Sequence, residues 1–205
     1  MTTTASPNHH AHHPRFAGAS GFVAALSMVT GRGSDARLAA RLVGLEPGDA
    51  LIDIGSGPGA AARHAARLGA TVTGVDPAAV MRRVARVLTL PTTRVRYVDG
   101  TAEHIPAPDR SVTVVWSIAT VHHWQDVDAG LAEARRVLQP GGRLVAIERH
   151  TEPGARGHAS HGWTREQAQA FADRCTAAGF ADPIVEENTD GHRTTISVRA
   201  TSPDD

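Results

Sequence analysis

The 205-residue chain contains one cysteine, few aromatic residues and no excess charge of either sign. The single thiol, Cys175, excludes a disulfide framework and a thiolate zinc site within one chain. Basic and acidic residues number 21 each and form no basic stripe, which argues against nucleic acid or an anionic membrane as a partner. Aromatic residues make up 4% of the chain, so a pocket of stacked rings for a polycyclic ligand is poorly supplied. A small-molecule partner fits this composition better.

Long apolar runs are also absent. The first apolar stretch, residues 21–29, is too short to span a bilayer, and the residues before it lack the basic region of a secretory signal. Residues 1–14 are rich in Thr, Ala, His and Pro, and we expect them to form a disordered tail. We therefore expect one domain over residues 15–205 of a cytoplasmic protein, with the oligomeric state left open between a monomer and a homodimer.

The most informative segment is an apolar run that ends in a glycine-rich turn, Leu-Ile-Asp-Ile-Gly-Ser-Gly-Pro-Gly over residues 51–59. Its uninterrupted apolar start is typical of a parallel strand buried on both faces, and its glycines let the backbone approach a ligand where a Cβ atom would clash. A second apolar run, residues 71–75, ends in Asp76. That carboxylate lies about 20 residues after the glycines, where a Rossmann-like unit places an acceptor for ribose hydroxyls. The pattern predicts a site for a nucleotide-type cofactor.

A dinucleotide is the main alternative cofactor, because Gly55-Ser-Gly57-Pro-Gly59-Ala60 satisfies the fingerprint G-x-G-x-x-G/A. Asp53, two residues before the first glycine, argues against it, since a carboxylate suits a cationic amine better than a pyrophosphate. The chain is also too short for a catalytic partner domain.

Strand-like and helix-like runs alternate beyond this turn, which predicts a doubly wound α/β sheet. Residues 164–178 predict a capped helix that ends at Gly179. Thr189-Asp190-Gly191 between two β-rich runs predicts a C-terminal hairpin, and therefore antiparallel strands on an otherwise parallel sheet. The expected strands lie near residues 50–54, 71–75, 94–98, 112–117 and 143–148, and the expected helices near residues 36–43, 59–68, 78–88 and 129–138.

Four motifs together resemble the class I S-adenosylmethionine-dependent methyltransferases over roughly residues 51–148: D-x-G-x-G-x-G, V-D, G-T-A-E-x-I-P and R-V-L-x-P-G-G-R-L. The resemblance implies the Rossmann-like methyltransferase fold, which is an α/β, doubly wound and mostly parallel seven-stranded sheet with a C-terminal antiparallel hairpin. It also implies S-adenosylmethionine as the cofactor, with the glycine turn around its methionine part and Asp76 on its ribose hydroxyls. The cofactor-binding residues implied in this way are Asp53, Gly55, Ser56, Gly57, Gly59, Asp76, Pro77, Thr101, Ala102, Glu103 and Ser117.

The sequence departs from the family pattern at Thr101, where the G-D-A-E loop usually has an acidic residue that accepts a hydrogen bond from the adenine amino group. A threonine hydroxyl can still accept this bond, although without charge. The adenine contact is therefore expected to be weaker, or to be carried by the backbone at Ala102.

Catalytic residues are expected just after the strands, because ligands of such sheets bind outside the carboxyl ends. His122 and His123 follow the fourth expected strand, and Glu148 ends the fifth. Related small-molecule O-methyltransferases have a similar arrangement, which implies catalytic roles for His122, His123 and Glu148. His122 is the first choice of base for a hydroxyl substrate, with Glu148 orienting it. A neutral imidazole suits the removal of a hydroxyl proton near pH 7. The alternative is that the histidines cap the next helix or pack beside Trp124.

The segment over residues 149–163 is longer than most connections, and we expect it to be a lid over the site. Its histidines His150, His158 and His161 offer a metal site as the alternative; they lack the carboxylates that magnesium prefers and suit zinc or nickel. A metal at the His-rich tail is a second alternative. The function that we expect includes no metal at either place. Residues 15–33 are expected to form an N-terminal cap over the site or to pack in the core.

The sequence therefore predicts an enzyme that binds S-adenosylmethionine and methylates a small-molecule acceptor, with a hydroxyl oxygen favoured. An NAD(P)-dependent oxidoreductase and a non-catalytic protein that binds adenosyl ligands are the two alternatives.

Overall fold

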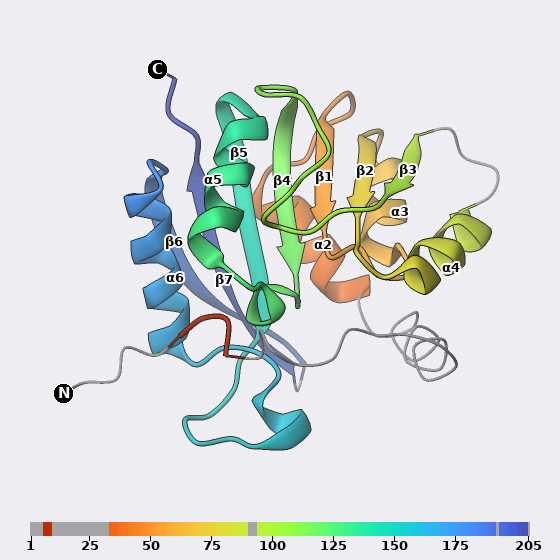
Figure 1. The fold of residues 1–205 in the computed structure, drawn as a ribbon. Helices are drawn as coiled ribbons and strands as arrows, with labels where there is room; N and C mark the ends of the chain where they lie inside the picture. Colours follow the sequence, from red (N-terminus) through yellow and green to blue (C-terminus); the bar gives the residue numbers. More distant parts are fainter. Residues whose placement is uncertain (1–5, 10–32, 90–93, 192, 205) are drawn as a thin grey trace.

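The computed structural model describes residues 6–9, 33–89, 94–191 and 193–204, which form an α/β fold around one sheet (Figure 1). The strand order is β3-β2-β1-β4-β5-β7-β6. Strands β1 to β5 run parallel, and β7 pairs antiparallel with both β5 and β6. The strands are β1 (Ala50–Ile54), β2 (Thr71–Val75), β3 (Val95–Val98), β4 (Val112–Ile118), β5 (Leu138–Arg149), β6 (Ala181–Asp190) and β7 (Arg193–Thr201).

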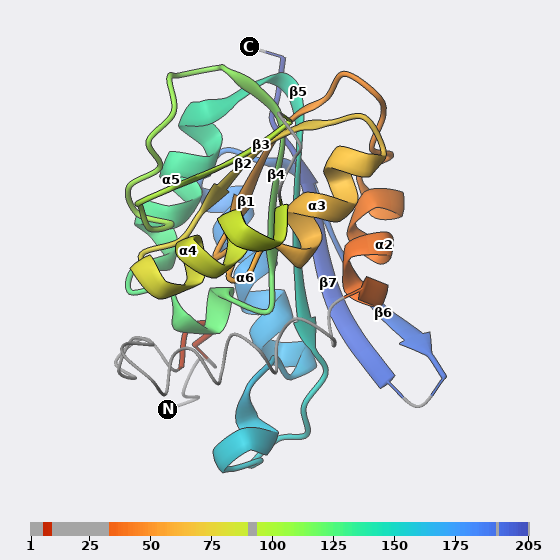
Figure 2. The same cartoon turned by 90° about the vertical axis from the view of Figure 1, so that its right-hand side faces the viewer.

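Apolar layers cover both faces of the sheet, because successive side chains of a buried strand point to opposite faces. Ile52 of β1 packs in a layer with Leu131 and Phe171, whereas its neighbour Leu51 packs in the other layer with Ala62. Figure 2 shows helices of the two layers, α5 and α2, on opposite sides of the sheet. The helices are α2 (Gly33–Leu42), α3 (Ala60–Arg67), α4 (Ala79–Thr89), α5 (Val127–Val137) and α6 (Arg165–Ala177), with short 3-10 turns η1 (Val121–His123) and η2 (Gly157–Ser160).

This architecture confirms the fold class predicted from the sequence, including the C-terminal hairpin. Several boundaries differ from the expected ranges, and the contacts explain two of these differences. Helix α5 begins at Val127, two residues earlier than expected, because the Asp126 side chain accepts hydrogen bonds from two backbone N–H groups of the first turn. Strand β5 begins at Leu138, five residues earlier than expected, because the Gly141 N–H donates to the Ser202 carbonyl beyond β7.

The expected N-terminal cap, residues 15–33, lies outside the described residues except for Gly33, which starts α2. The expected domain boundaries stay predictions. Among the described helices, none combines the length and the apolar character that a membrane span needs.

The single thiol gives a direct test of how α6 packs on the sheet. Cys175 is fully buried, and burial raises the pKa of its thiol to about 12. The reactive thiolate is therefore almost absent at about pH 8, and reagents cannot reach it. We expect the native chain to resist iodoacetamide and the guanidinium-unfolded chain to take up one label, as read by intact-mass spectrometry. Rapid labelling of the native chain would contradict this packing.

Candidate active site

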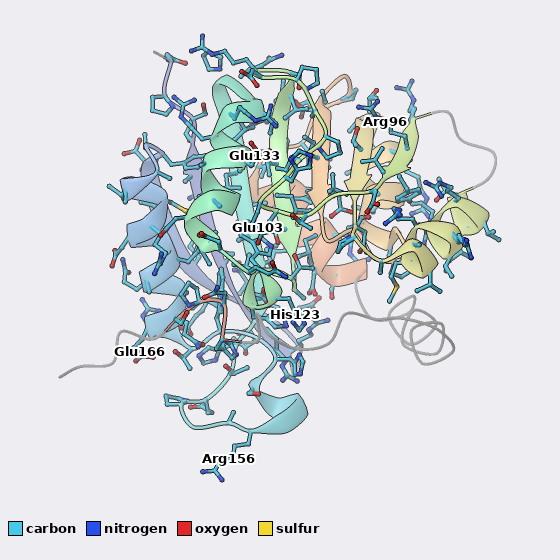
Figure 3. The ribbon with its side chains drawn as sticks, viewed as in Figure 1. Arg96, Glu103, His123, Glu133, Arg156 and Glu166 are labelled. Atoms are coloured by element: carbon cyan, nitrogen blue, oxygen red, sulfur yellow. The ribbon has the colours of Figure 1, made fainter. Side chains whose placement is uncertain are left out.

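The carboxyl ends of the central parallel strands meet at one edge of the sheet, the lower edge in Figure 1. The residues predicted for cofactor binding and catalysis stand mostly at or just after these strand ends, where open α/β sheets bind their ligands. In Figure 3, His123 lies at this edge, whereas Arg156 lies far out on the segment that follows β5.

The turn after β1 keeps its shape through three glycines at positive φ: Gly55, Gly57 and Gly59. A Cβ atom on Gly55 would lie 2.5 Å from the Thr120 side chain, and one on Gly59 would lie 2.0 Å from the Tyr97 hydroxyl. A Cβ atom on Gly57 would meet only a backbone oxygen, at 4.0 Å. Neighbouring side chains therefore leave no room for a Cβ atom at Gly55 or Gly59. Gly57, in contrast, borders open space that a ligand can occupy.

Asp76, at the end of β2, ties this turn to the start of α4. Its Oδ2 accepts from the Gly57 N–H and its Oδ1 from the Ala78 N–H, both at 2.8 Å. Next to Gly57, the Ser56 hydroxyl is buried and has no hydrogen-bond partner within the described part of the chain. A buried polar atom normally has a partner, so an unpaired hydroxyl in a glycine turn fits a ligand contact. Asp53 is buried on β1 at the same edge.

Two of the other predicted cofactor residues, Glu103 and Ser117, have side-chain partners. The Glu103 carboxylate accepts from the Gln125 N–H at 2.7 Å, which holds the turn before α5. The Ser117 hydroxyl is buried at the end of β4 and lies 2.6 Å from the Thr120 hydroxyl. Ala102 is buried, Thr101 is partly buried and Pro77 is exposed beside Asp76.

Two residues of this region were missed by the sequence prediction. Thr120 covers Gly55 and donates to the Ile54 carbonyl at 3.2 Å, directly after Ala119, which has a positive φ of 55°. Such backbone strain is frequent at functional sites. Tyr97 on β3 supports the glycine turn from behind, and burial raises the pKa of its hydroxyl. A threonine and a tyrosine in unremarkable local sequence carry no motif, so only the fold reveals them.

His122 and Glu148 form a buried pair between the ends of β4 and β5. The His122 Nδ1 lies 2.8 Å from the Glu148 Oε2, and both side chains are almost completely inaccessible to solvent. The Glu148 carboxylate also accepts from the His122 backbone N–H at 3.4 Å. Because a carboxylate accepts hydrogen bonds, Nδ1 carries the proton of the neutral ring and Nε2 carries its lone pair. The structure thus brings together the two residues that the sequence predicted as base and orienting acid.

Two more imidazoles lie beside His122. Its ring centroid lies 4.1 Å from that of His123 and 5.4 Å from that of His161. Of the three histidines on the segment after β5 that the sequence offered for a metal, His161 reaches this cluster, and the side chain of His158 lies outside the described part of the structure. The cluster therefore combines one histidine of that segment with the pair that follows β4.

The neck of this segment determines where His161 lies. The backbone N–H of Trp163 donates to the Arg149 carbonyl, and the backbone N–H of Thr151 donates to the Trp163 carbonyl, both at 2.8 Å. Gly162 fits tightly between them, because a Cβ atom there would lie 2.1 Å from the Arg149 carbonyl oxygen. The closed neck holds His161 against η1.

Residues 6–9, in the segment expected to be a disordered tail, cross the same edge and are drawn in red in Figure 1. The buried Trp163 indole donates to the Pro7 carbonyl at 2.8 Å, and the Asn8 side-chain amide donates to the Trp124 carbonyl at 3.0 Å. The contacts use backbone carbonyls and one amide, which leave no pattern in the sequence.

Comparison with known proteins agrees with this geometry. Residues 52–146 match the family model described as a methyltransferase domain. The chain is 34% identical over 114 residues to the demethylmenaquinone methyltransferase of Tropheryma whipplei, which covers 55% of this chain and 46% of that protein. It is 39% identical over 116 residues to the 27-O-demethylrifamycin SV methyltransferase of Amycolatopsis mediterranei, covering 53% and 43%. In both cases the match spans less than half the length of the relative.

Among solved structures, a SAM-dependent methyltransferase from Aquifex aeolicus has a similar fold, with a TM-score of 0.73 at 19% identity over 88% of this chain and 98% of that one. The match to the methyltransferase-domain model, the similar relatives and the fold support a class I S-adenosylmethionine-dependent methyltransferase. This confirms the family that the sequence resembled, and S-adenosylmethionine is the cofactor of that family.

The glycine turn yields a prediction about stability. Gly57→Ala and Gly59→Ala both place a side chain at positive φ, which costs about 1–2 kcal/mol. Gly59→Ala also overlaps the Tyr97 ring, which adds roughly 1–3 kcal/mol. We expect urea unfolding to show a clearly larger loss of stability for Gly59→Ala. Equal unfolding midpoints at an unchanged m-value would show that Tyr97 does not lie against the turn.

Proposed function

We propose that this chain transfers a methyl group from S-adenosylmethionine to a hydroxyl oxygen of a small-molecule acceptor, with His122 as the proton acceptor. The observation that carries the proposal is the buried His122–Glu148 pair at the edge where the glycine turn and Asp76 also lie. The family assignment supports the cofactor, and the pair supports the chemistry of an acceptor that must lose a proton.

The proposed cofactor site uses the features that a ligand would complete. Gly57 leaves open space above the turn, and the Ser56 hydroxyl has no hydrogen-bond partner within the described residues. Asp76 is proposed to accept from the ribose hydroxyls, and Asp53 to face the cationic amine of the methionine part. The Thr101 hydroxyl or the backbone at Ala102 is proposed to meet the adenine. Glu103 and Ser117 are proposed as supports of this site because each already holds a neighbouring turn.

S-adenosylmethionine supplies an electrophilic methyl group on a sulfonium. The acceptor oxygen forms the new bond to that methyl while the bond to sulfur breaks, and the acceptor's proton must pass to a base. The His122 ring is proposed to accept this proton at Nε2, because Nδ1 is hydrogen-bonded to Glu148. Glu148 stabilises the charge that the ring then gains, which is the task of an orienting carboxylate. His123, beside it and partly exposed, is proposed to line the acceptor side.

The named relatives support a small-molecule acceptor. One is named for demethylmenaquinone and the other for an oxygen of demethylrifamycin. The oxygen acceptor is proposed here because the second relative is named for it and because a histidine base is useful chiefly where a hydroxyl must be deprotonated.

The cofactor assignment predicts that Asp76→Asn weakens binding of S-adenosylhomocysteine by roughly tenfold or more, because charge-assisted hydrogen bonds contribute about 1.5–3 kcal/mol each. Asp99→Asn is the matched control, since this exposed carboxylate follows the neighbouring strand β3 and pairs with Arg82. Calorimetric titration of the two variants with S-adenosylhomocysteine, S-adenosylmethionine and NADH measures the difference. Binding of NADH in place of both adenosyl ligands would overturn the proposed function in favour of an oxidoreductase.

The base assignment predicts a loss of methyl transfer in His122→Gln of roughly 10²–10⁴-fold with cofactor affinity unchanged, because loss of a general base affects chemistry alone. Glu148→Gln is expected to slow transfer less, since the ring keeps a partner. His64→Gln on α3 is the control. Rates are measured with methyl-labelled S-adenosylmethionine and an acceptor found by screening hydroxyl compounds. Unchanged rates in both His122→Gln and Glu148→Gln would exclude base catalysis by this pair.

A further inference from the structure

The His122, His123 and His161 cluster offers a chemistry that the methyl-transfer proposal does not use. Each of the three side chains contributes one ring nitrogen, and these nitrogens all lie within 4.8 Å of one another. We propose that the cluster is a binding site for a late first-row divalent cation of the zinc type, held by three imidazoles. The proposal does not depend on methyl transfer, because it needs only the three rings and their surroundings.

The donor set indicates the class of metal. Neutral imidazole nitrogen suits zinc, nickel and copper, whereas magnesium and calcium prefer oxygen ligands. The three ligands of this cluster are all histidines, so none of them is a carboxylate. Three protein nitrogens with a fourth position open to solvent or substrate is an arrangement that zinc adopts in catalytic sites.

Glu148 strengthens this assignment. A histidine that binds metal commonly donates its other ring N–H to a carboxylate, which fixes the tautomer and orients the ring. The 2.8 Å contact between His122 Nδ1 and Glu148 has this form, and it leaves Nε2 as the nitrogen able to bind a cation. His9 also stacks near His122, but its two ring nitrogens already contact Ser160 and Gln167.

The adjustment needed to bind a metal is small. Tetrahedral zinc with bonds near 2.05 Å places its nitrogen ligands about 3.4 Å apart, so the rings must approach by at most about 1.4 Å. His122 is buried and held by Glu148, whereas His123 and His161 are partly exposed. The two partly exposed rings can therefore rotate toward the buried one, and their exposed side admits the ion.

The site shares one atom with the proposed base. The same Nε2 of His122 would bind a metal or accept a proton, so a bound cation and base catalysis exclude each other at this ring.

Calorimetric titration with zinc chloride tests the proposal, using a tag-free full-length chain in which His10, His12 and His13 are replaced by alanine. This background removes three imidazoles of the His-rich tail that could compete for zinc. We expect one zinc ion per chain, no binding of magnesium, and a tetrahedral visible spectrum when cobalt replaces zinc.

On this background, His161→Ala is expected to weaken zinc binding at least tenfold, and Glu148→Gln by roughly 10–100-fold through the orientation of His122. His104→Ala, an exposed histidine outside the cluster, is the matched control. His161 is partly exposed, so the fold of His161→Ala is expected to persist and is checked by circular dichroism. Absence of zinc binding on the background, or unchanged affinity in a folded His161→Ala chain, would overturn the site. Titration with S-adenosylhomocysteine is independent of these results, so failure of the metal site and of the cofactor site are distinguishable.

Discussion

The parallel pairing of β1, β2, β4 and β5 between two apolar layers is the constraint on which the site depends. Parallel strands place all their carboxyl ends at one edge, and burial of both faces keeps those ends from shifting. The glycine turn, the Asp76 carboxylate and the His122–Glu148 pair are far apart in sequence, and they meet because of this geometry. A buried histidine–carboxylate pair adds little to stability, because both polar groups lose their contacts with water. The position of this pair at the carboxyl edge of the sheet is therefore better explained by chemistry than by folding.

The sequence predicted the sheet well because each buried strand leaves a local apolar run and each turn leaves glycine, proline or a capping residue. Predicted positions that lie directly at strand ends, such as Asp76 and Glu148, could be placed from the motif alone. The contacts between distant segments could not. His161 reaches η1 only because the neck at Trp163 closes, and Tyr97 supports a turn that precedes it by about 40 residues. Such packing has no periodicity in the sequence.

His122 carries two proposals with different consequences. The Glu148 contact orients the His122 ring, and the two proposals use its other nitrogen either as a base for a hydroxyl or as a ligand for zinc. The metal site is proposed because His123 and His161 lie close enough to His122 to complete it. A site of this kind would respond to the zinc available to the protein as well as to its acceptor.

A crystal structure of the chain with S-adenosylhomocysteine would show whether the cofactor and the His122–Glu148 pair meet at this edge of the sheet. We predict that the ligand lies over the turn at Gly57, that its ribose hydroxyls contact Asp76 and that its sulfur points toward His122. A ligand bound at another part of the sheet would contradict the proposed cofactor site. A ligand whose sulfur faces away from the His122–Glu148 pair would contradict the proposed role of His122.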